Sequence, residues 1–359
     1  MNDKNYCVIL AGGIGLKLWP SSTIQCPKQF IDFLGRGETL IQSTYNRIAR
    51  FVPKENIIVT TNEQYVHFVR EQLPELSERN LLVEPMRRNT LPSATWATVE
   101  ISHRESDAQV LVVPSDQMIY DEALFQEEVM SAFNYVSKYD RILSLSVFPS
   151  RAETNYGYVQ MGESVYNGFY HVKSFTEKPE LEFAKLFVDN REFLWNTGMF
   201  LWSTRTFMAV ANEMKAQLPM IDKAEDLLKH GIELDDIVKR AFSMCPNVSI
   251  EEACLDKHDN TDVMLCHFGW NDLGTWQTLF NAASKSDGNV VMQGEAMLYD
   301  CNECIVKVPG DKVVVAQGLN DYVIAEENNI LMICRKDDPK AIRMFVNDLQ
   351  LKSVSKFKV

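Results

Sequence analysis

The sequence predicts an α/β fold whose main domain is built on a mostly parallel β-sheet, followed by a small β module. Over residues 1–285, short runs that are apolar almost throughout alternate with segments long enough to form helices. Strands buried on both faces of a parallel sheet show this pattern, and helices connect them. Over residues 286–359, short strand-like runs follow one another, separated by Gly, Asn and Asp. Such a succession is typical of a compact β module.

Each element is predicted from its apolar pattern and from the turn or polar residues that bound it. The main domain has five predicted strands, at 6–10, 56–61, 81–84, 109–114 and 141–148. The module has six shorter ones, at 289–292, 296–299, 304–308, 312–316, 322–325 and 330–334. A final helix is predicted over 339–351, because apolar residues recur there at helical spacing: Ala341, Ile342, Phe345, Val346 and Leu349.

The composition excludes several classes of protein. The 359 residues are 46% hydrophobic, yet no apolar stretch approaches the length of a membrane span. We therefore expect a soluble globular protein without a membrane partner. The first ten residues hold no apolar run of signal-peptide length behind a basic region, so we expect it in the cytoplasm. The eight cysteines are scattered through a long chain, which favours free thiols over a disulfide framework.

The net charge of −13 argues against a nucleic-acid partner, because proteins that bind long polyanions carry a basic face. A small phosphate ligand is compatible with this charge if a metal ion and a few local lysines neutralise it. The sequence is also compatible with a homodimer.

A glycine-rich stretch, LAGGIGLKLWP at 10–20, follows the first predicted strand. A glycine turn at the carboxyl end of such a strand can bring backbone N–H groups close to an anion. The stretch is neither the dinucleotide-binding fingerprint, which would need a glycine where Leu18 stands, nor a Walker loop. Lys28, just behind Pro27, is a compact point charge suited to a phosphate oxygen. A structural turn beside solvated lysines is the alternative interpretation.

Together with PKQF at 27–30, this stretch resembles the signature of the sugar-1-phosphate nucleotidylyltransferases, and most of all that of the mannose-1-phosphate guanylyltransferases (GDP-mannose pyrophosphorylases). More blocks that resemble the family follow in the family's order: EPMRRNT at 84–90, VPSD at 113–116, YGY at 156–158, FTEKP at 175–179, LWNTGMF at 194–200 and FGWNDLGTW at 268–276. The tail, including GLND at 318–321, resembles the family's short left-handed β-helix module.

The resemblance implies a Rossmann-like, GT-A-like nucleotidyltransferase domain over 1–285 and a left-handed β-helix module with a C-terminal helix over 286–359. It implies a transferase that uses GTP and mannose 1-phosphate. The sugar phosphate attacks the α-phosphorus of GTP in line, GMP is transferred to give GDP-mannose, and pyrophosphate leaves. Alignment of the two anions and stabilisation of developing charge are the main demands of this reaction.

The resemblance also assigns site residues. Lys17, Lys28 and Asp116 are implied to be catalytic, and Asp116 and Asp272 to bind Mg²⁺, which suits two carboxylates completed by phosphates and water. The implied substrate-binding residues are Leu10, Ala11, Gly12, Gly13, Gly15, Glu84, Arg88, Asn89, Thr90, Ser115, Tyr156, Gly157, Glu177, Lys178 and Asn196. Without the flanking matches, both aspartates would instead be interpreted as turn or capping residues.

One departure from the family pattern leaves alternatives open. Where the family usually has Gly-Thr-Arg, this chain has Gly15, Leu16 and Lys17. Arginine holds phosphate with a planar fork, whereas lysine presents a single charge. The alternatives to a mannose-1-phosphate guanylyltransferase are an enzyme for another manno-configured sugar 1-phosphate, such as a heptose, and a catalytically weak paralogue that binds sugar nucleotides and regulates a partner.

Overall fold

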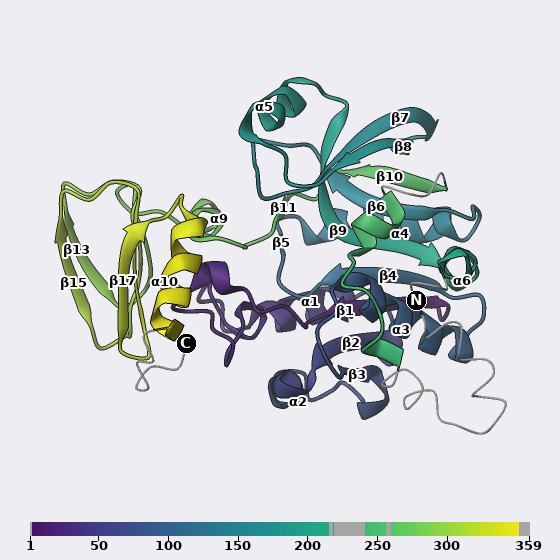
Figure 1. Ribbon diagram of the computed structural model, residues 1–359, viewed down its shortest axis with the longest axis horizontal. Helices are drawn as coiled ribbons and strands as arrows, with labels where there is room; N and C mark the ends of the chain where they lie inside the picture. The colour runs from purple at the N-terminus through teal and green to yellow at the C-terminus, as the bar shows by residue number, and fades with distance from the viewer. Residues whose placement is uncertain (1, 215–217, 219–240, 256–259, 352–359) are drawn as a thin grey trace. The chain divides into compact units, whose positions relative to one another are not determined.

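The computed structural model describes residues 2–214, 218, 241–255 and 260–351 (Figure 1). The chain forms two compact units. The first, here called the sheet unit, comprises Met1–Gly12, Tyr45–Ser115 and Ile119–Trp270. The second, here called the module unit, comprises Gly13–Thr44, Asp116–Met118 and Asn271–Val359. These units are defined by packing, and the predicted division into domains at residue 285 stays a prediction.

The sheet unit is built on a nine-stranded sheet of strand order β3-β2-β1-β4-β9-β6-β10-β8-β7. The strands are β1 (Asn5–Leu10), β2 (Ile57–Asn62), β3 (Leu81–Glu84), β4 (Gln109–Pro114), β6 (Ile142–Val147), β7 (Tyr158–Tyr166), β8 (Phe169–Thr176), β9 (Phe193–Ser203) and β10 (Thr261–Cys266). β3, β2, β1 and β4 run parallel, as do β6 and β10. β9 pairs antiparallel with both β4 and β6. The predicted mixed, mostly parallel α/β sheet is confirmed.

The five strands predicted for the main domain correspond to β1, β2, β3, β4 and β6. β7, β8, β9 and β10 of this sheet were not predicted. In β9 the apolar run is interrupted by Asn196, Thr197 and Gly198, where the pairing with β6 shifts register. Gly198 has a φ of 74°, a left-handed conformation that glycine adopts at little cost. This irregularity is a β-bulge, which turns side chains away from regular alternation.

Short polar side chains cap the first turns of three helices of the sheet unit. Its described helices are α2 (Val66–Gln72), α3 (Thr90–Arg104), α4 (Glu122–Val136), α5 (Leu181–Asp189) and α6 (Thr204–Glu213), and the capped ones are α3, α4 and α6. Asp121 accepts a hydrogen bond from the Leu124 N–H at the start of α4, and Ser203 accepts one from Thr206 at the start of α6. Such N-caps stabilise helices by roughly 1 kcal/mol. The buried indole of Trp202 on β9 stacks on Phe207 of α6 at 4.5 Å between ring centroids.

The described residues also form several shorter elements. They are the 3-10 turns η1 (Leu16–Leu18), η2 (Lys28–Phe30), η3 (Lys54–Asn56), η4 (Glu63–Tyr65) and η5 (Glu78–Asn80), the π-helical turn η6 (Glu251–Leu255), helix α1 (Leu40–Ile48), and the paired strands β5 (Met118–Ile119) and β11 (Trp270–Asn271).

The described residues of the module unit form six further strands and two further helices. They are β12 (Val290–Gln293), β13 (Glu295–Tyr299), β14 (Ile305–Lys307), β15 (Val313–Gln317), β16 (Tyr322–Glu327), β17 (Ile330–Arg335), α9 (Trp276–Ala282) and α10 (Pro339–Leu351). β12, β14 and β16 pair in parallel, β17 closes that sheet antiparallel, and β13 pairs in parallel with β15. Strands that return in parallel along two sheets are compatible with the predicted β-helix module, and the predicted final helix is confirmed.

One hydrophobic core joins the glycine-rich stretch to the C-terminal helix inside the module unit. Leu18 of η1 and Trp276 of α9 are fully buried in it together with Ile342 and Val346 of α10. The indole N–H of Trp276 also donates to the main-chain oxygen of Trp19, at 3.1 Å. α10 is therefore packed directly against η1.

Among the helices in the described part of the chain, none is long and apolar enough to cross a membrane. All eight cysteines are free, as predicted.

We predict that Ile342→Ala lowers the free energy of unfolding by about 2–5 kcal/mol, because it leaves a cavity in the core shared by α10 and η1. The control is Met344→Ala on the exposed side of the same helix, where we expect a change within about 0.5 kcal/mol. Chemical denaturation of both variants measures the difference. Equal destabilisation by the two substitutions would contradict the packing described for α10.

Candidate active site

The glycine-rich stretch turns sharply at Gly15 in the module unit. Gly15 has a φ of 67°, and a Cβ there would lie 2.8 Å from Cγ of Lys28 and 3.0 Å from Oγ of Ser22. Two side chains fix the preceding carbonyls: Ser22 Oγ donates to the Ile14 oxygen at 3.1 Å, and Gln29 Nε2 donates to the Gly13 oxygen at 2.9 Å. A larger residue at position 15 would therefore have to displace the lysine stem.

Lys28 connects both predicted metal-binding aspartates. Its ammonium nitrogen lies 3.1 Å from Oδ2 of Asp116 and donates to the main-chain oxygen of Asp272 at 3.0 Å. The Lys28 side chain is only 11% exposed, and that of Asp116 20%. Because charge-assisted hydrogen bonds are stronger in a partly buried setting, this lysine fixes the Asp116 carboxylate and the Asp272 turn together.

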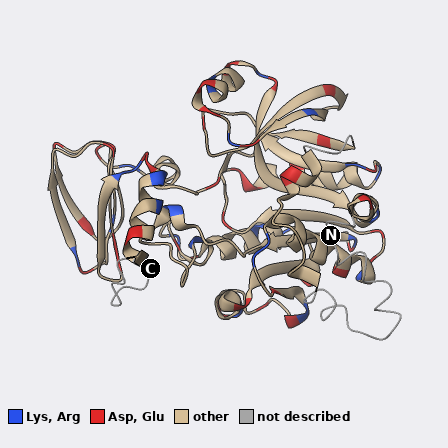
Figure 2. Ribbon diagram, in the orientation of Figure 1, with Lys and Arg blue, Asp and Glu red and all other residues tan. Residues whose placement is uncertain are grey.

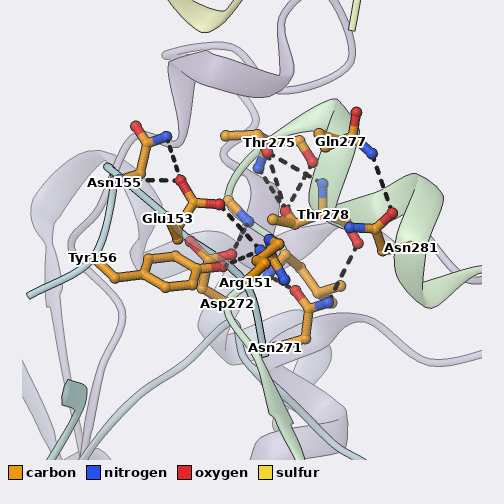
Figure 3. A network of polar contacts seen from close by, with 12 residues as sticks. Arg151, Glu153, Asn155, Tyr156, Asn271, Asp272, Thr275, Gln277, Thr278 and Asn281 are labelled. Atoms are coloured by element: carbon orange, nitrogen blue, oxygen red, sulfur yellow. Dashed lines mark hydrogen bonds and ion pairs between the residues drawn. The ribbon is translucent and has the colours of Figure 1, made fainter. Parts of the chain in front are cut away.

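The turn at Asp272 has a tightly defined backbone. Oδ1 of Asp272 accepts a hydrogen bond from the Gly274 N–H at 3.0 Å, and a Cβ on Gly274 would lie 2.3 Å from Oδ2. Leu273 adopts a φ of 46°, which costs free energy for a residue other than glycine. Thr275 and Thr278 then form a capping box that starts α9 (Figure 3). The geometry of Asp272 is thus compatible with both predicted roles of this residue, as a turn residue and as a metal ligand.

A cavity of about 510 Å³ opens beside this cluster inside the module unit. Its lining includes Gly15, Leu16, Lys17, Lys28, Gly274 and Arg343. This volume lies in the range of small-molecule sites.

The first predicted substrate-binding residues of the sheet unit lie at the carboxyl ends of β1 and β4. Leu10 pairs with Pro114 across the two strands, and the Ser115 N–H donates to the Leu10 oxygen at 3.1 Å. The Ala11 oxygen accepts a hydrogen bond from the Thr61 hydroxyl at 3.0 Å. The carboxyl edge of an open α/β sheet is where such folds bind ligands.

Glu84 is buried beneath the first glycine of the stretch. Its Oε2 lies 3.4 Å from where a Cβ of Gly12 would be, and it accepts a hydrogen bond from Asn62 Nδ2 at 3.3 Å. Burial raises the pKa of the Glu84 carboxyl, an effect that the nearby positive charge of Arg87 partly offsets. The structure therefore places the Glu84 carboxyl group next to Gly12.

The segment after Glu84 leads into α3 through strained backbone. Asn89 has a φ of 68°, and its side-chain oxygen accepts from the Thr90 N–H at 2.9 Å. The Thr90 hydroxyl accepts from the Ile250 N–H at 3.0 Å, and Arg88 donates to the Ser243 oxygen at 2.6 Å. Strain held by surrounding contacts is frequent at ligand-binding segments.

The predicted sugar-side residues Tyr156, Gly157, Glu177, Lys178 and Asn196 come together in the sheet unit. The Lys178 N–H donates to the Tyr156 oxygen at 3.2 Å, and the Asn196 N–H donates to the Gly157 oxygen at 2.9 Å. A Cβ on Gly157 would lie 2.7 Å from the Phe175 ring and 2.9 Å from Oε2 of Glu177, so a side chain at position 157 would have to displace both neighbours. Glu177 and Lys178 also form an ion pair.

Glu251 is a residue of this cluster that sequence reasoning missed. Nδ2 of Asn196 donates to Oε1 of Glu251 at 3.0 Å, while its Oδ1 accepts from Ser144 Oγ at 3.1 Å. Burial raises the pKa of the Glu251 carboxyl, and the nearby charge of Glu177 raises it further. Glu251 stands in the π-helical turn η6, and π-helical turns are frequent at functional sites. No local pattern pointed to it.

Arg151 was also missed. Its guanidinium lies 5.1 Å from the Trp195 ring centroid and 5.9 Å from that of Tyr156, and it forms an ion pair with Glu153 at 3.1 Å (Figure 3). Tyr156 packs edge-on against Trp195 and Trp270, each at 5.1 Å between centroids. These aromatic contacts hold Tyr156 rigidly, which preorganises the backbone of its neighbour Gly157.

Comparisons with known proteins agree with this architecture. Residues 6–288 match the family model described as nucleotidyl transferase. The chain is 32% identical to the alginate biosynthesis protein AlgA of Pseudomonas aeruginosa, over 95% of this chain and 71% of that protein. It is 30% identical to the mannose-1-phosphate guanylyltransferase RfbM of Salmonella typhimurium, over 98% of this chain and 74% of that protein.

Among solved structures, one from Thermus thermophilus named mannose-1-phosphate geranyltransferase superposes with a TM-score of 0.84 at 28% identity. It covers 97% of this chain, and this chain covers 99% of it.

The chain therefore belongs to the nucleotidyl transferase family, whose members are enzymes that generally use a divalent metal. Within that family, the predicted resemblance to the mannose-1-phosphate guanylyltransferases is confirmed.

We predict that Glu84→Gln changes how stability depends on pH. The pKa of Glu84 is raised in the folded state, so its contribution is full below the ordinary carboxyl pKa and is lost as the pH rises through the folded pKa. Glutamine does not ionise, so the variant should gain stability relative to the parent between about pH 4 and about pH 8. Urea denaturation at both values measures this. A difference independent of pH would contradict it.

Proposed function

We propose that the protein transfers GMP from GTP to mannose 1-phosphate, giving GDP-mannose and pyrophosphate. The names of its relatives support this reaction. The observation that carries the proposal is the arrangement around Lys28, whose ammonium group joins the Asp116 carboxylate to the Asp272 turn beside a cationic cavity. A transferase that brings two anionic substrates together needs cations and hard oxygen ligands at one place.

The residues of the module unit have the chemistry to bind the triphosphate. In this proposal, the backbone around Gly13 and Gly15 approaches the phosphates closely, because neither residue has a side chain to prevent it. Lys17 and Lys28 line the cavity and neutralise charge there. A lysine near the β- and γ-phosphates stabilises the leaving pyrophosphate, which gains charge as the bond to the α-phosphorus breaks.

In this proposal, Asp116 and Asp272 hold a Mg²⁺ ion. Their carboxylates are hard oxygen donors of the type this cation prefers. Among the described residues, no group of three or more His, Cys, Asp or Glu side chains is placed to hold a metal ion. Substrate phosphates and water would therefore complete the coordination of an ion held by these two residues. The bound ion would supply charge neutralisation for the triphosphate.

The residues of the sheet unit have the chemistry to bind the sugar and the base. Glu177 can accept from two hydroxyls, and Asn196 uses one Nδ2 hydrogen for Glu251, which leaves the other for a ligand hydroxyl. Lys178 can meet the sugar phosphate. The segment from Glu84 to Thr90, which includes Arg88 and Asn89, is proposed to contact guanine. Leu10, Ala11, Gly12 and Ser115 would shape the sheet edge for the nucleotide.

We further propose that the protein works in the cytoplasm as a homodimer. The eight free cysteines support a reducing compartment. Apolar side chains more than half exposed on β13, β15 and β17 support an association surface: Met297, Tyr299, Val313, Val315, Leu331 and Ile333.

We predict that Asp116→Asn and Asp272→Asn each lower turnover about a hundredfold or more, because each removes a charge that the proposed metal site needs. A chelator should abolish turnover in the parent, and added Mg²⁺ should restore it. Asp300→Asn, an exposed carboxylate of the β module, is the matched control and should turn over like the parent. Undiminished turnover in either of the first two variants would remove the metal assignment.

The reaction itself is tested by pyrophosphate release from purified protein with GTP, mannose 1-phosphate and Mg²⁺. We predict release with GTP and much slower release with ATP, because a site that satisfies the guanine N1–H and amino group leaves polar groups unpaired with adenine. Equal rates with ATP and GTP would contradict the donor assignment.

The same assay decides between acceptors. Faster release with a manno-configured heptose 1-phosphate than with mannose 1-phosphate would reassign the acceptor. No release with any sugar phosphate, together with normal GTP binding, would favour the regulatory paralogue instead.

A further inference from the structure

The cavity beside the glycine turn has a cation that the motifs do not include. Arg343 of α10 lines it together with Lys17 and Lys28. No aspartate or glutamate is among the described residues that line this cavity. In a chain of net charge −13, three basic side chains that line one cavity make it a locally basic site, although Lys28 is paired with Asp116.

The position of Arg343 is set by packing. Ile342 and Val346 of α10 are buried in the core that also contains Leu18 of η1. The side chain of Asp338 accepts hydrogen bonds from the N–H groups of Lys340 and Ala341, which fixes the start of the helix. Since residues three and four apart share a helix face, Arg343, Val346 and Asn347 meet the cavity together.

Arg343 is exposed and is not neutralised inside the protein. The described part of the chain places no carboxylate within ion-pair distance of its guanidinium, whereas Arg335 in the same unit pairs with Asp337 at 3.1 Å. Figure 2 shows the basic residues along α10. An unpaired guanidinium that faces a cavity with two lysines is suited to a ligand of several negative charges.

We propose that Arg343 binds the diphosphate group of the substrate, meaning the β- and γ-phosphates of the nucleotide and the pyrophosphate that leaves. The inference rests on the proposed function and deepens it, because it assigns part of phosphate binding to the C-terminal helix. Lys17 in the glycine turn offers a single point charge. Arg343 adds the planar fork that can hold two phosphate oxygens at once.

The test compares Arg343→Ala with Lys340→Ala, which removes a positive charge from the same helix at a residue that does not line the cavity. Calorimetry measures the affinity of each variant for inorganic pyrophosphate with Mg²⁺. Kinetics measure the KM for GTP, for pyrophosphate in the reverse reaction, and for mannose 1-phosphate. Arg343→Gln, which keeps most of the side-chain stem, repeats the measurement if the alanine variant does not fold.

We expect Arg343→Ala to weaken pyrophosphate binding and to raise the KM for GTP about tenfold or more, the usual effect of losing a charge-assisted hydrogen bond. Arg343→Lys should recover part of the loss. The KM for mannose 1-phosphate and all constants of Lys340→Ala should stay within about twofold of the parent.

Two results would overturn the inference. The first is that folded Arg343→Ala or Arg343→Gln binds pyrophosphate with the same affinity as the parent. The second is that Lys340→Ala loses as much pyrophosphate affinity as Arg343→Ala, because the effect would then come from the overall positive charge of the helix. Failure of the proposed function is distinguishable, because the parent would then bind pyrophosphate without releasing it from GTP and mannose 1-phosphate.

Discussion

The ion pair between Lys28 and Asp116, completed by the hydrogen bond from Lys28 to the main-chain oxygen of Asp272, is the interaction on which the candidate site depends. It connects three stretches of the module unit that are distant in sequence. A partly buried ammonium group has to be neutralised and hydrogen bonded, and both partners here are predicted site residues. The lysine therefore has a structural role as well as the catalytic role proposed for it.

Two glycines make this arrangement sterically feasible. Gly15 leaves room for the stem of Lys28, and Gly274 leaves room for the carboxylate of Asp272. In both cases an added Cβ would lie closer to a neighbouring atom than van der Waals contact allows. In the glycine-rich stretch that is proposed to bind the phosphates, Gly15 thus also allows close approach to the protein's own cation, and this constraint is independent of any substrate.

Sequence reasoning worked where the signal is local. The strands that end at Leu10 and Pro114 were predicted from apolar runs, and their pairing brings the segments before Gly12 and Asp116 to one sheet edge. β9 was not predicted, because its bulge at Asn196 interrupts the apolar pattern.

Contacts between distant segments could not be predicted from the sequence. Glu251 meets Asn196 across 55 residues, and it does so from a π-helical turn that has no simple sequence signature. The spacing of apolar residues over 339–351 predicted a helix that includes Arg343. Only the core that packs α10 against η1 shows that Arg343 lines the same cavity as Lys17. The role of each motif residue stays a prediction.

A double-mutant cycle on Lys28 and Asp116 tests the central claim most directly. The free energy of unfolding is measured for the parent, Lys28→Met, Asp116→Asn and the double variant. If the pair organises the site, the two substitutions are coupled by about 1.5–3 kcal/mol, as expected for a hydrogen bond between charged groups. Losses that add within about 0.5 kcal/mol would show that the two residues act independently, and would contradict the account.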